Sequence, residues 1–289
     1  MSNLLRISVI IPVFNGETTI AYSIRSILRQ TIKPDEIIVV DDGSTDATFQ
    51  IASRYSVKIV RHRRNLGVAC ARNTGILATQ SEIVVFVDAD CIAGYRLLQY
   101  VIENFKNDPL VAAVGGREIP IYVNGIANIC RAHRRQGWGP VKVYNPPYLF
   151  GLCSAFKREK LIEVGLYDPR FRTNAEDIDI CLRLKSQGYK LVYDPRMTVF
   201  HLRGDNVSSL LKLIYRSHYF GTLAYLKNVG CKEERIIKTW IEALIREIIS
   251  KNPARIILAP FTVSAEALGK KHAFSQTKYF ERIKRRKLR

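Results

Sequence analysis

Apolar runs alternate with amphipathic segments across the first 115 residues of the chain. The strand-like runs cover residues 7–11, 36–40, 57–60, 83–87 and 111–114. Between them, Ile20, Ile24, Ile27 and Leu28 recur at helical spacing, and Ser44-Thr45-Asp46 offers a cap for a helix over 47–55. Repeated strand-helix units predict an α/β fold with a mostly parallel, doubly wound sheet.

The pattern changes after residue 115. Residues 116–150 contain several Gly and Pro residues, and we expect them to form an irregular, loop-rich wall. The pattern then predicts a helix over 176–187 that Gly188 ends. Further strands are predicted over 148–156, 191–193 and 198–200.

The last part of the chain is predicted to be helical and basic. Beyond Asn206 an apolar stripe runs from Ile236 to Ile249, and Asn252-Pro253 ends that helix. From Lys270 to Arg289, nine Lys or Arg residues against Glu281 alone give a local net charge of +8. Smaller basic clusters span 61–64 and 131–135. Such runs are either solvated faces or surfaces that bind an anion.

Composition restricts the class of protein. With 289 residues, 47% of them hydrophobic, the chain can bury a sizeable core. The six cysteines contain no Cys-x-x-Cys pair, which argues against structural zinc and indicates a reduced compartment. No segment reaches the roughly 18 uninterrupted apolar residues that a membrane span needs. The net charge of +19 predicts a negatively charged partner, such as nucleic acid, anionic lipid or a phosphorylated substrate.

Two carboxylates, Asp88 and Asp90, directly follow the apolar run 83–87. Strand alternation sends both side chains to one face, and the carboxyl end of a parallel strand opens into the crevice where α/β proteins bind ligands. Hard oxygen ligands at that place suit Mg²⁺ or Mn²⁺ bridging a diphosphate. An acidic strand-end turn without a metal is the alternative.

The first two strands also end in polar segments. Residues 12–17 lack the glycine spacing of a dinucleotide-binding loop, which argues against a nicotinamide or flavin dehydrogenase. Phe14 either offers an aromatic face to a base or belongs to the core. Asp41 and Asp42 end the second strand, and their carboxylates can accept hydrogen bonds from a base imide or from ribose hydroxyls.

Four ordered motifs resemble those of family 2 glycosyltransferases of the GT-A fold. They are Ile11-Pro-Val-Phe-Asn-Gly16, Val40-Asp-Asp-Gly-Ser-Thr-Asp46, Asn65-Leu-Gly-Val-Ala-Cys-Ala-Arg-Asn73 and Val87-Asp-Ala-Asp90. The resemblance covers about residues 5–220 and implies a Rossmann-like, mostly parallel central sheet flanked by helices. It implies a glycosyltransferase domain over 1–220, with a nucleotide-binding half (1–115) and an acceptor-side half (116–220), followed by a helical, basic extension (221–289).

The resemblance also implies roles for donor-side residues. Asp88 would contact ribose, Asp90 would bind a Mg²⁺ or Mn²⁺ ion on the donor diphosphate, and Arg72 would face the nucleotide. Without the resemblance, Arg72 reads as a residue on a helix surface. The residues implied to bind the nucleotide sugar, with UDP-sugar favoured, are Pro12, Val13, Phe14, Glu17, Asp41, Asp42, Arg72, Asp88, Ala89 and Asp90.

On the acceptor side, the segments 151–159 and 165–171 resemble those that precede the family's Glu-Asp motif, which here is Glu176-Asp177-Ile178-Asp179. Asp177 is the predicted general base, because an inverting transfer needs one carboxylate to take the proton of the acceptor hydroxyl. The predicted acceptor-side residues are Gly151, Glu176 and Trp138.

Two of these residues have alternative roles. Glu176 fits a capping box with Thr173, in which case its role is structural. His201 resembles a histidine that adds a metal ligand in some family members, and a satisfied loop histidine is the alternative. The processive members' Gln-x-x-Arg-Trp motif is absent after the Glu-Asp motif, which favours addition of a single sugar.

We therefore expect an inverting, metal-assisted glycosyltransferase that moves one sugar from a nucleotide-diphosphate sugar to an acceptor of a surface glycan or lipid-linked intermediate. We expect it in the cytoplasm, peripheral on the inner face of an anionic membrane. The alternatives are a polyprenyl-phosphate sugar synthase and a basic nucleic-acid-binding protein. The second lacks a recognition helix or aromatic sheet motif, so we expect no nucleic-acid partner.

Overall fold

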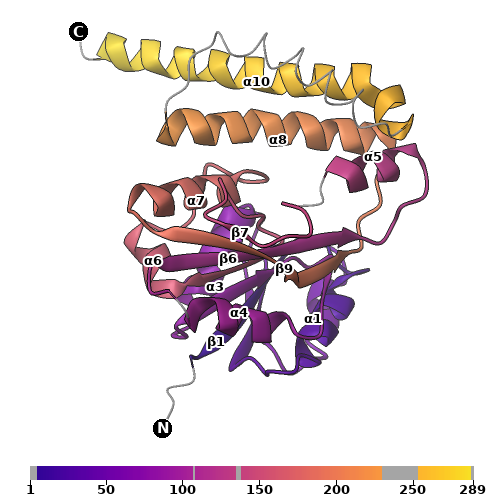
Figure 1. The fold of residues 1–289 in the computed structure, drawn as a ribbon, viewed down its shortest axis with the longest axis vertical. Helices are drawn as coiled ribbons and strands as arrows, with labels where there is room; N and C mark the ends of the chain where they lie inside the picture. The colour runs from indigo at the N-terminus through magenta and orange to yellow at the C-terminus, as the bar shows by residue number, and fades with distance from the viewer. Residues whose placement is uncertain (1–4, 107, 135–137, 230–252, 288–289) are drawn as a thin grey trace. The chain divides into compact units, whose positions relative to one another are not determined.

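The computed structural model describes residues 5–106, 108–134, 138–229 and 253–287 (Figure 1). The chain forms two compact units. The first comprises Met1–Ile121 and Gln136–Arg203, and the second comprises Tyr122–Arg135 and Gly204–Arg289. The domain boundary expected at residue 220 falls inside a helix of the second unit. The expected apolar stripe over 236–249 lies outside the described residues.

Four parallel strands form one half of the central sheet in the first unit. In sheet order they are β3 (Lys58–Arg61), β2 (Glu36–Asp41), β1 (Ile7–Val13) and β4 (Ile83–Val87). The strands β1, β2 and β4 are almost completely buried because helices cover both faces of the sheet (Figure 1), so they read as continuous apolar runs. The predicted α/β class and its parallel sheet are confirmed.

The other half of the sheet mixes strand directions. Strand β8 (Cys153–Lys157) is antiparallel to β4, and the order continues with β6 (Val111–Pro120), β9 (Lys190–His201) and β5 (Cys91–Ala93), while β7 (Val143–Tyr144) pairs with β9. The predicted end of a strand at residue 114 was wrong, because β6 continues to Pro120 alongside β9.

Strand β9 is one element where two short strands were expected. Tyr193 pairs with Gly115 and Thr198 with Arg117, so residues 194–197 of β9 oppose Gly116 alone. The Asp194 carboxylate accepts a hydrogen bond from the Arg196 backbone N–H at 3.0 Å, which closes this bulge. Pro195 lies inside this apolar pattern, and a proline there indicates a break in a strand. In β9 the break is a bulge.

The helices of the first unit cover two apolar layers. They are α1 (Ile20–Leu28), α2 (Thr48–Ala52), α3 (Val68–Leu77), α4 (Leu97–Lys106), α6 (Arg158–Glu163) and α7 (Glu176–Ser186). One layer contains the buried residues of α1 and α4, and the other contains those of α3 and α7. Helix α2 is shorter than the predicted helix over 47–55.

The second unit contains the helices α5 (Ile126–Arg134), α8 (Val207–Asn228) and α10 (Pro253–Lys287). The expectation of irregular structure throughout 116–150 was therefore wrong. Helix α5 forms because Ala127 and Cys130 are buried against Leu210, Ile214 and Leu258, a tertiary contact that local sequence does not reveal. Helix α8 begins with a capping box between Asn206 and Ser209.

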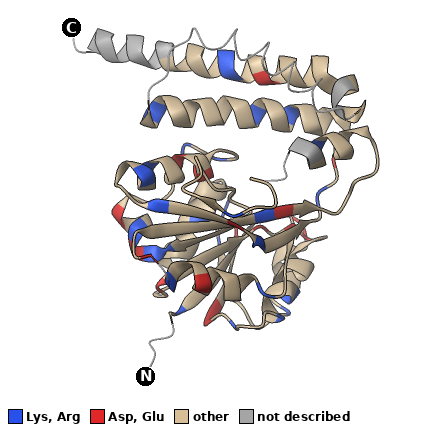
Figure 2. Ribbon diagram, in the orientation of Figure 1, with Lys and Arg blue, Asp and Glu red and all other residues tan. Residues whose placement is uncertain are grey.

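Basic residues are distributed over both units (Figure 2). Arg131, expected in a basic cluster, is instead 1% exposed, with its Nε 3.1 Å from Asp205 Oδ2. This arginine therefore stabilises the second unit and contributes no basic surface. No helix among the described residues is long and apolar enough to cross a membrane.

Candidate active site

Two loops at the carboxyl end of the sheet are joined by hydrogen bonds. The backbone N–H of Asn15 donates to Ser44 Oγ at 2.9 Å, and that of Ala47 donates to the Glu17 carboxylate at 3.0 Å. These bonds hold the ends of β1 and β2 side by side. Between them, Phe14 is 47% exposed, so the interpretation of Phe14 as a core residue is wrong. Its ring is free to stack on a base, whereas Pro12 and Val13 are buried.

Asp42 orders the loop that leads into α3. Its two oxygens accept hydrogen bonds from the backbone N–H groups of Leu66 at 2.9 Å and Gly67 at 2.8 Å, and His62 Nδ1 lies 2.7 Å away. The neighbouring Asp41 accepts from Ser44 N at 2.8 Å. Both carboxylates are buried and serve the protein's own structure, and their contact with a nucleotide stays a prediction.

Arg72 is a buried bridge between the end of β4 and the start of α7. Its Nη1 donates to Glu176 Oε1 at 2.7 Å and its Nη2 to Asp88 Oδ1 at 3.1 Å. The rings of Phe86 and Tyr167 lie over the guanidinium, with centroids 5.4 and 5.6 Å from Cζ. Burial opposes the charge, but the two carboxylates outweigh it and raise the pKa of Arg72. The interpretation of Arg72 as a helix-surface residue is therefore wrong.

The structure brings Asp90 and His201 together beside Asp88. His201 Nε2 lies 3.0 Å from Asp90 Oδ2, and His201 Nδ1 lies 2.6 Å from Glu118 Oε1. Burial works against protonation of His201, but hydrogen bonds to Asp90 and Glu118 prevail and raise its pKa to about 9. Cys91 Sγ completes a group whose ligand atoms all lie within 4.8 Å of one another. A carboxylate and an imidazole at this spacing fit a divalent cation.

Sequence reasoning missed Glu118. This carboxylate is 4% exposed and orients the imidazole of His201 through the nitrogen that faces away from Asp90. The prediction ended the strand at residue 114, so Glu118 fell in a segment expected to be irregular. The continuous β6–β9 ladder, which pairs Glu118 with Val199, is what brings it beside His201.

Helix α7 begins at the Glu-Asp motif. Ala175 precedes it in the left-handed region (φ 66°), and no side chain caps the helix, so the predicted capping box of Thr173 and Glu176 does not form. Asp177 instead accepts hydrogen bonds from Gly151 N at 2.9 Å and Ile178 N at 2.8 Å. A Cβ on Gly151 would lie 2.4 Å from Arg72 Nη1, so only glycine fits there.

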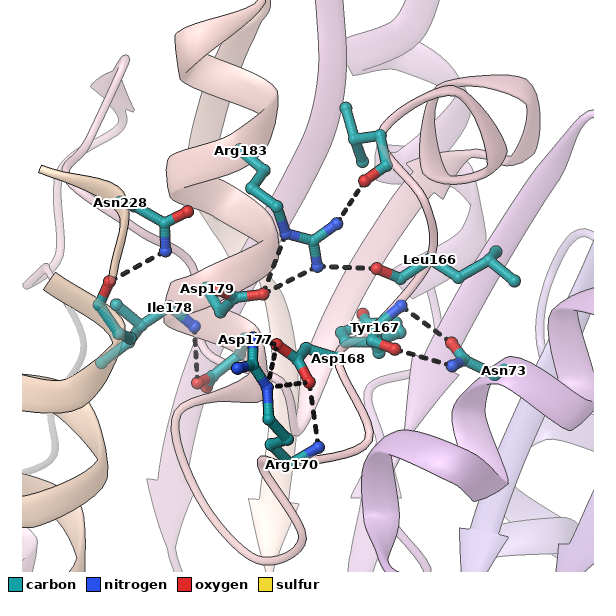
Figure 3. Close-up of polar contacts among 12 residues, drawn as sticks. Asn73, Leu166, Tyr167, Asp168, Arg170, Asp177, Ile178, Asp179, Arg183 and Asn228 are labelled. Carbon is teal, nitrogen blue, oxygen red and sulfur yellow. Dashed lines mark hydrogen bonds and ion pairs between the residues drawn. The ribbon is translucent and has the colours of Figure 1, made fainter. Parts of the chain in front are cut away.

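The rest of α7 is anchored by a second ion pair (Figure 3). Arg183 Nη2 lies 2.7 Å from Asp179 Oδ2 and donates to the Leu166 carbonyl at 2.6 Å. Tyr167, the next residue of the same loop, donates its backbone N–H to Asn73 Oδ1 of α3 at 2.8 Å. These contacts fix the start of α7 against α3 and therefore fix Asp177 relative to Arg72.

Aromatic side chains form a wall near Gly151. Trp138 Nε1 donates to the Tyr148 carbonyl at 3.0 Å, and the Trp138 ring centroid lies 5.3 Å from Tyr148 and 6.3 Å from Phe150. Phe150 directly precedes Gly151, whose N–H holds Asp177. We call Trp138, Tyr148 and Phe150 the aromatic wall.

Comparison with known proteins gives one family. Residues 8–165 match the family described as glycosyl transferase family 2. The poly-β-1,6-N-acetyl-D-glucosamine synthase of Staphylococcus aureus is 28% identical in an alignment of 223 residues that covers 71% of this chain and 52% of that protein. The chain thus spans about half the length of the curated relatives it matches.

Solved structures show the same fold. A mannosyltransferase from Pyrobaculum calidifontis in complex with GDP-Man and Mn²⁺ has a TM-score of 0.68 at 21% identity, covering 93% of this chain and 88% of that one. GalNAc-T7 with UDP, GalNAc and Mn²⁺ has a TM-score of 0.60 at 20% identity, covering 96% of this chain and 57% of that one.

The burial of Glu176 predicts a pH dependence of stability. Burial is the main cause that raises the pKa of Glu176 from 4.5 to about 7. The charge of Arg72 opposes this rise, and the neighbouring Asp177 adds to it. The folded state thus holds the proton of the Glu176 carboxyl group more tightly than the unfolded chain does. The contribution of Glu176 to the free energy of unfolding is therefore greatest below pH 4.5 and falls as the pH rises to 7. Between pH 5 and pH 8 we expect the wild type to lose on the order of 1 kcal/mol of unfolding free energy relative to Glu176→Gln.

Urea unfolding at both pH values measures this difference. The matched control is Glu159→Gln, because the Glu159 side chain is 73% exposed and its substitution should shift stability equally at both pH values. A wild type that gains stability over Glu176→Gln as the pH rises would mean that Glu176 is ionised in its pair with Arg72.

Proposed function

The chain belongs to glycosyl transferase family 2, and on that basis we propose that it transfers a single sugar, with inversion, from a nucleotide-diphosphate sugar to a hydroxyl of a glycan or lipid-linked acceptor. The observation that carries this proposal is the position of Asp177. Its carboxylate accepts two backbone N–H bonds, and it lies beside the Glu176–Arg72–Asp88 bridge that leads to the donor side.

In the proposed mechanism Asp177 removes the proton of the acceptor hydroxyl while that oxygen attacks the anomeric carbon. Direct attack by the acceptor on the face opposite the leaving group inverts the configuration. The hydrogen bonds from Gly151 and Ile178 orient the Asp177 carboxylate, and the aromatic wall positions the acceptor sugar against it.

Asp90 and His201 would hold a divalent cation, Mg²⁺ or Mn²⁺, with Glu118 orienting the imidazole. When bound, the cation offsets the negative charge on the departing nucleoside diphosphate. Binding requires the neutral imidazole, so His201 would release its proton to the solvent as the ion binds. The presence of Mn²⁺ in both solved structures named above supports a divalent ion.

The donor-side roles are proposed on the same geometry. The exposed ring of Phe14 would stack on the base, with UDP the favoured nucleotide, and Asp41 would accept from its imide. Arg72 is engaged by two carboxylates, so its role toward the nucleotide would be to position Asp88 at the ribose. Glu17 accepts a hydrogen bond from the backbone N–H of Ala47 and would thereby hold the loops around the base in place. The small side chain of Ala89 would leave space for the diphosphate.

The acceptor is proposed from the named relative, which synthesises a polysaccharide. We propose an acceptor from a surface glycan pathway and addition of one sugar, since the motif of processive members is absent from this chain. The second candidate, a polyprenyl-phosphate sugar synthase, would use polyprenyl phosphate as the sole acceptor. Assays with that lipid and with glycan acceptors separate the two.

The Asp177→Asn substitution should greatly slow transfer but keep the affinity for the donor nucleotide sugar. An amide cannot take the acceptor proton, so we expect a loss of roughly 10²-fold or more in kcat with near-native affinity for the nucleotide sugar. Glu176→Gln is the matched control and should lose less. Nucleotide-sugar turnover and donor binding are measured on both variants. Equal losses in both, or loss of donor binding in Asp177→Asn, would contradict the assignment of the base.

Removal of the metal should stop transfer. We expect no turnover in EDTA, full recovery on addition of Mn²⁺ or Mg²⁺, and loss of metal-dependent nucleotide binding in Asp90→Asn. Calorimetric titration of Mn²⁺ in the presence of the nucleotide measures the binding. Asp168→Asn, whose carboxylate pairs with Arg170 and is not part of the group of Asp90, Cys91 and His201, is the control and should bind metal normally. Undiminished turnover in EDTA would refute the proposed metal role.

Helix α10 supports a proposed location on a membrane surface. Ile257, Phe261 and Leu268 are 62%, 59% and 49% exposed and fall on one helical face. Basic residues add about 1 kcal/mol each near an anionic leaflet. We expect the wild type, but not a variant with all three changed to Ser, to sediment with anionic liposomes at low salt. Leu110→Ser, which removes an equally exposed leucine from the first unit, should sediment like the wild type. Equal sedimentation of the triple variant would refute this location.

A further inference from the structure

Arg117, in the first unit, is a partly buried arginine that has no ion-pair partner among the described residues. Arg117 lies on β6, and its Nε is buried without a hydrogen-bond partner. In the part of the chain that the structure describes, no hydrogen bond, ion pair or ring contact involves the Arg117 side chain. Arg72, which also has a buried and unbonded Nε, differs because Asp88 and Glu176 lie beside its guanidinium.

A guanidinium whose Nε is buried without a partner carries a desolvation cost, and substitution by an uncharged side chain removes that cost. Such a residue is expected where a ligand supplies the opposite charge. The position of Arg117 in the sheet shows which ligand can reach it.

The register of the sheet places Arg117 level with the carboxyl end of β4. Val87, the last residue of β4, lies opposite Cys153 of β8, and Gly115 of β6 lies opposite the next residue, Ser154. The strands β4 and β6 run in the same direction, because both are antiparallel to β8. Arg117 follows Gly115 by two residues and therefore lies level with Asp88, just beyond the carboxyl end of β4.

Arg117 also lies near the aromatic wall. Gly115, two residues before Arg117 in β6, pairs with Tyr193, and a Cβ on Gly115 would lie 2.7 Å from Leu149, which stands between Tyr148 and Phe150 of the aromatic wall. The positive charge of Arg117 also opposes the rise that burial causes in the pKa of Tyr193. Tyr193 Oη donates to the Gly139 carbonyl at 2.8 Å, directly after Trp138 in the chain. The aromatic wall then continues to Phe150 and so to Gly151, where Asp177 is bound.

We propose that Arg117 is the anion-binding residue of the acceptor subsite, and that the acceptor carries a phosphate or carboxylate group. This inference rests on the proposed function, because it identifies the chemical class of the acceptor. A planar guanidinium offers paired N–H donors that match either anion with two parallel hydrogen bonds. The aromatic wall would pack on the sugar ring while Arg117 holds the charged group.

Calorimetric titration of the full chain with three sugar probes tests this inference. The probes are methyl glucoside, methyl glucuronide and glucose 6-phosphate, which offer no charge, a carboxylate and a phosphate, each titrated with UDP and Mn²⁺ present. We expect at least one anionic probe to bind tenfold or more tightly than methyl glucoside. Arg117→Gln should remove that preference and leave the binding of methyl glucoside unchanged, and Arg117→Lys should keep part of it.

The control is Arg54→Gln, which removes the same charge from an exposed position and should keep the full preference. No preference for either anionic probe in the wild type, including no binding of them, overturns the inference. So does an equal loss in Arg54→Gln, since the effect would then come from net charge alone.

Thermal melting without ligand separates binding from structure. Loss of an uncompensated charge should leave the melting temperature of Arg117→Gln equal to or above that of the wild type, whereas a clear fall would show a structural role and overturn the inference. Titration of UDP and GDP alone with Mn²⁺ tests the proposed function separately. Nucleotide binding without charge preference defeats only the acceptor inference, and charge preference without nucleotide binding defeats only the proposed function.

Discussion

The buried guanidinium of Arg72 is the interaction on which the rest of the site depends. It joins Glu176 at the start of α7 to Asp88 at the end of β4, residues that no strand pairing brings together. The rings of Phe86 and Tyr167 lie over the guanidinium, and the Glu176 side chain is only 7% exposed, so little water can replace its partner. Removal of one member of a buried ion pair typically costs about 3–5 kcal/mol. The relative position of the end of β4 and the Glu-Asp motif is therefore a strong constraint of the fold.

This constraint explains two local features. Gly151 has no side chain because the Arg72 guanidinium occupies the place of a Cβ, and the same residue's N–H is then free to hold Asp177. Ala175 adopts a left-handed conformation, which costs a non-glycine residue of order 1–3 kcal/mol, directly before the two acidic residues. The strain is offset because Glu176 and Asp177 each find a fixed partner as soon as the helix begins.

The sequence predicted the parallel half of the sheet well and the mixed half poorly. Strands β1, β2 and β4 are buried on both faces, so their continuous apolar runs are unambiguous. Strand β6 ends in Gly-Gly-Arg-Glu-Ile-Pro, which has no strand pattern, because Gly116 faces a bulge and Arg117 and Glu118 point to opposite sides of the crevice. Helix α5 was missed for a similar reason, since its burial comes from α8 and α10 far along the chain.

The candidate site shows the same limit. Motif spacing placed Asp88, Asp90, Asp177 and His201 as separate acidic and imidazole groups at ends of elements, and the structure brings them to one crevice. Motif spacing could not show that Asp42 and Glu17 hold loops together, because these contacts depend on backbone N–H groups from other segments. Motif spacing also could not show that Glu118 contacts His201. This acid and Arg117 are neighbours on one strand, and alternation separates them, with Glu118 turned to His201 and Arg117 to the face of Gly115. A single stretch of β6 thus supplies the partner of His201 on one face of the sheet and an arginine on the other.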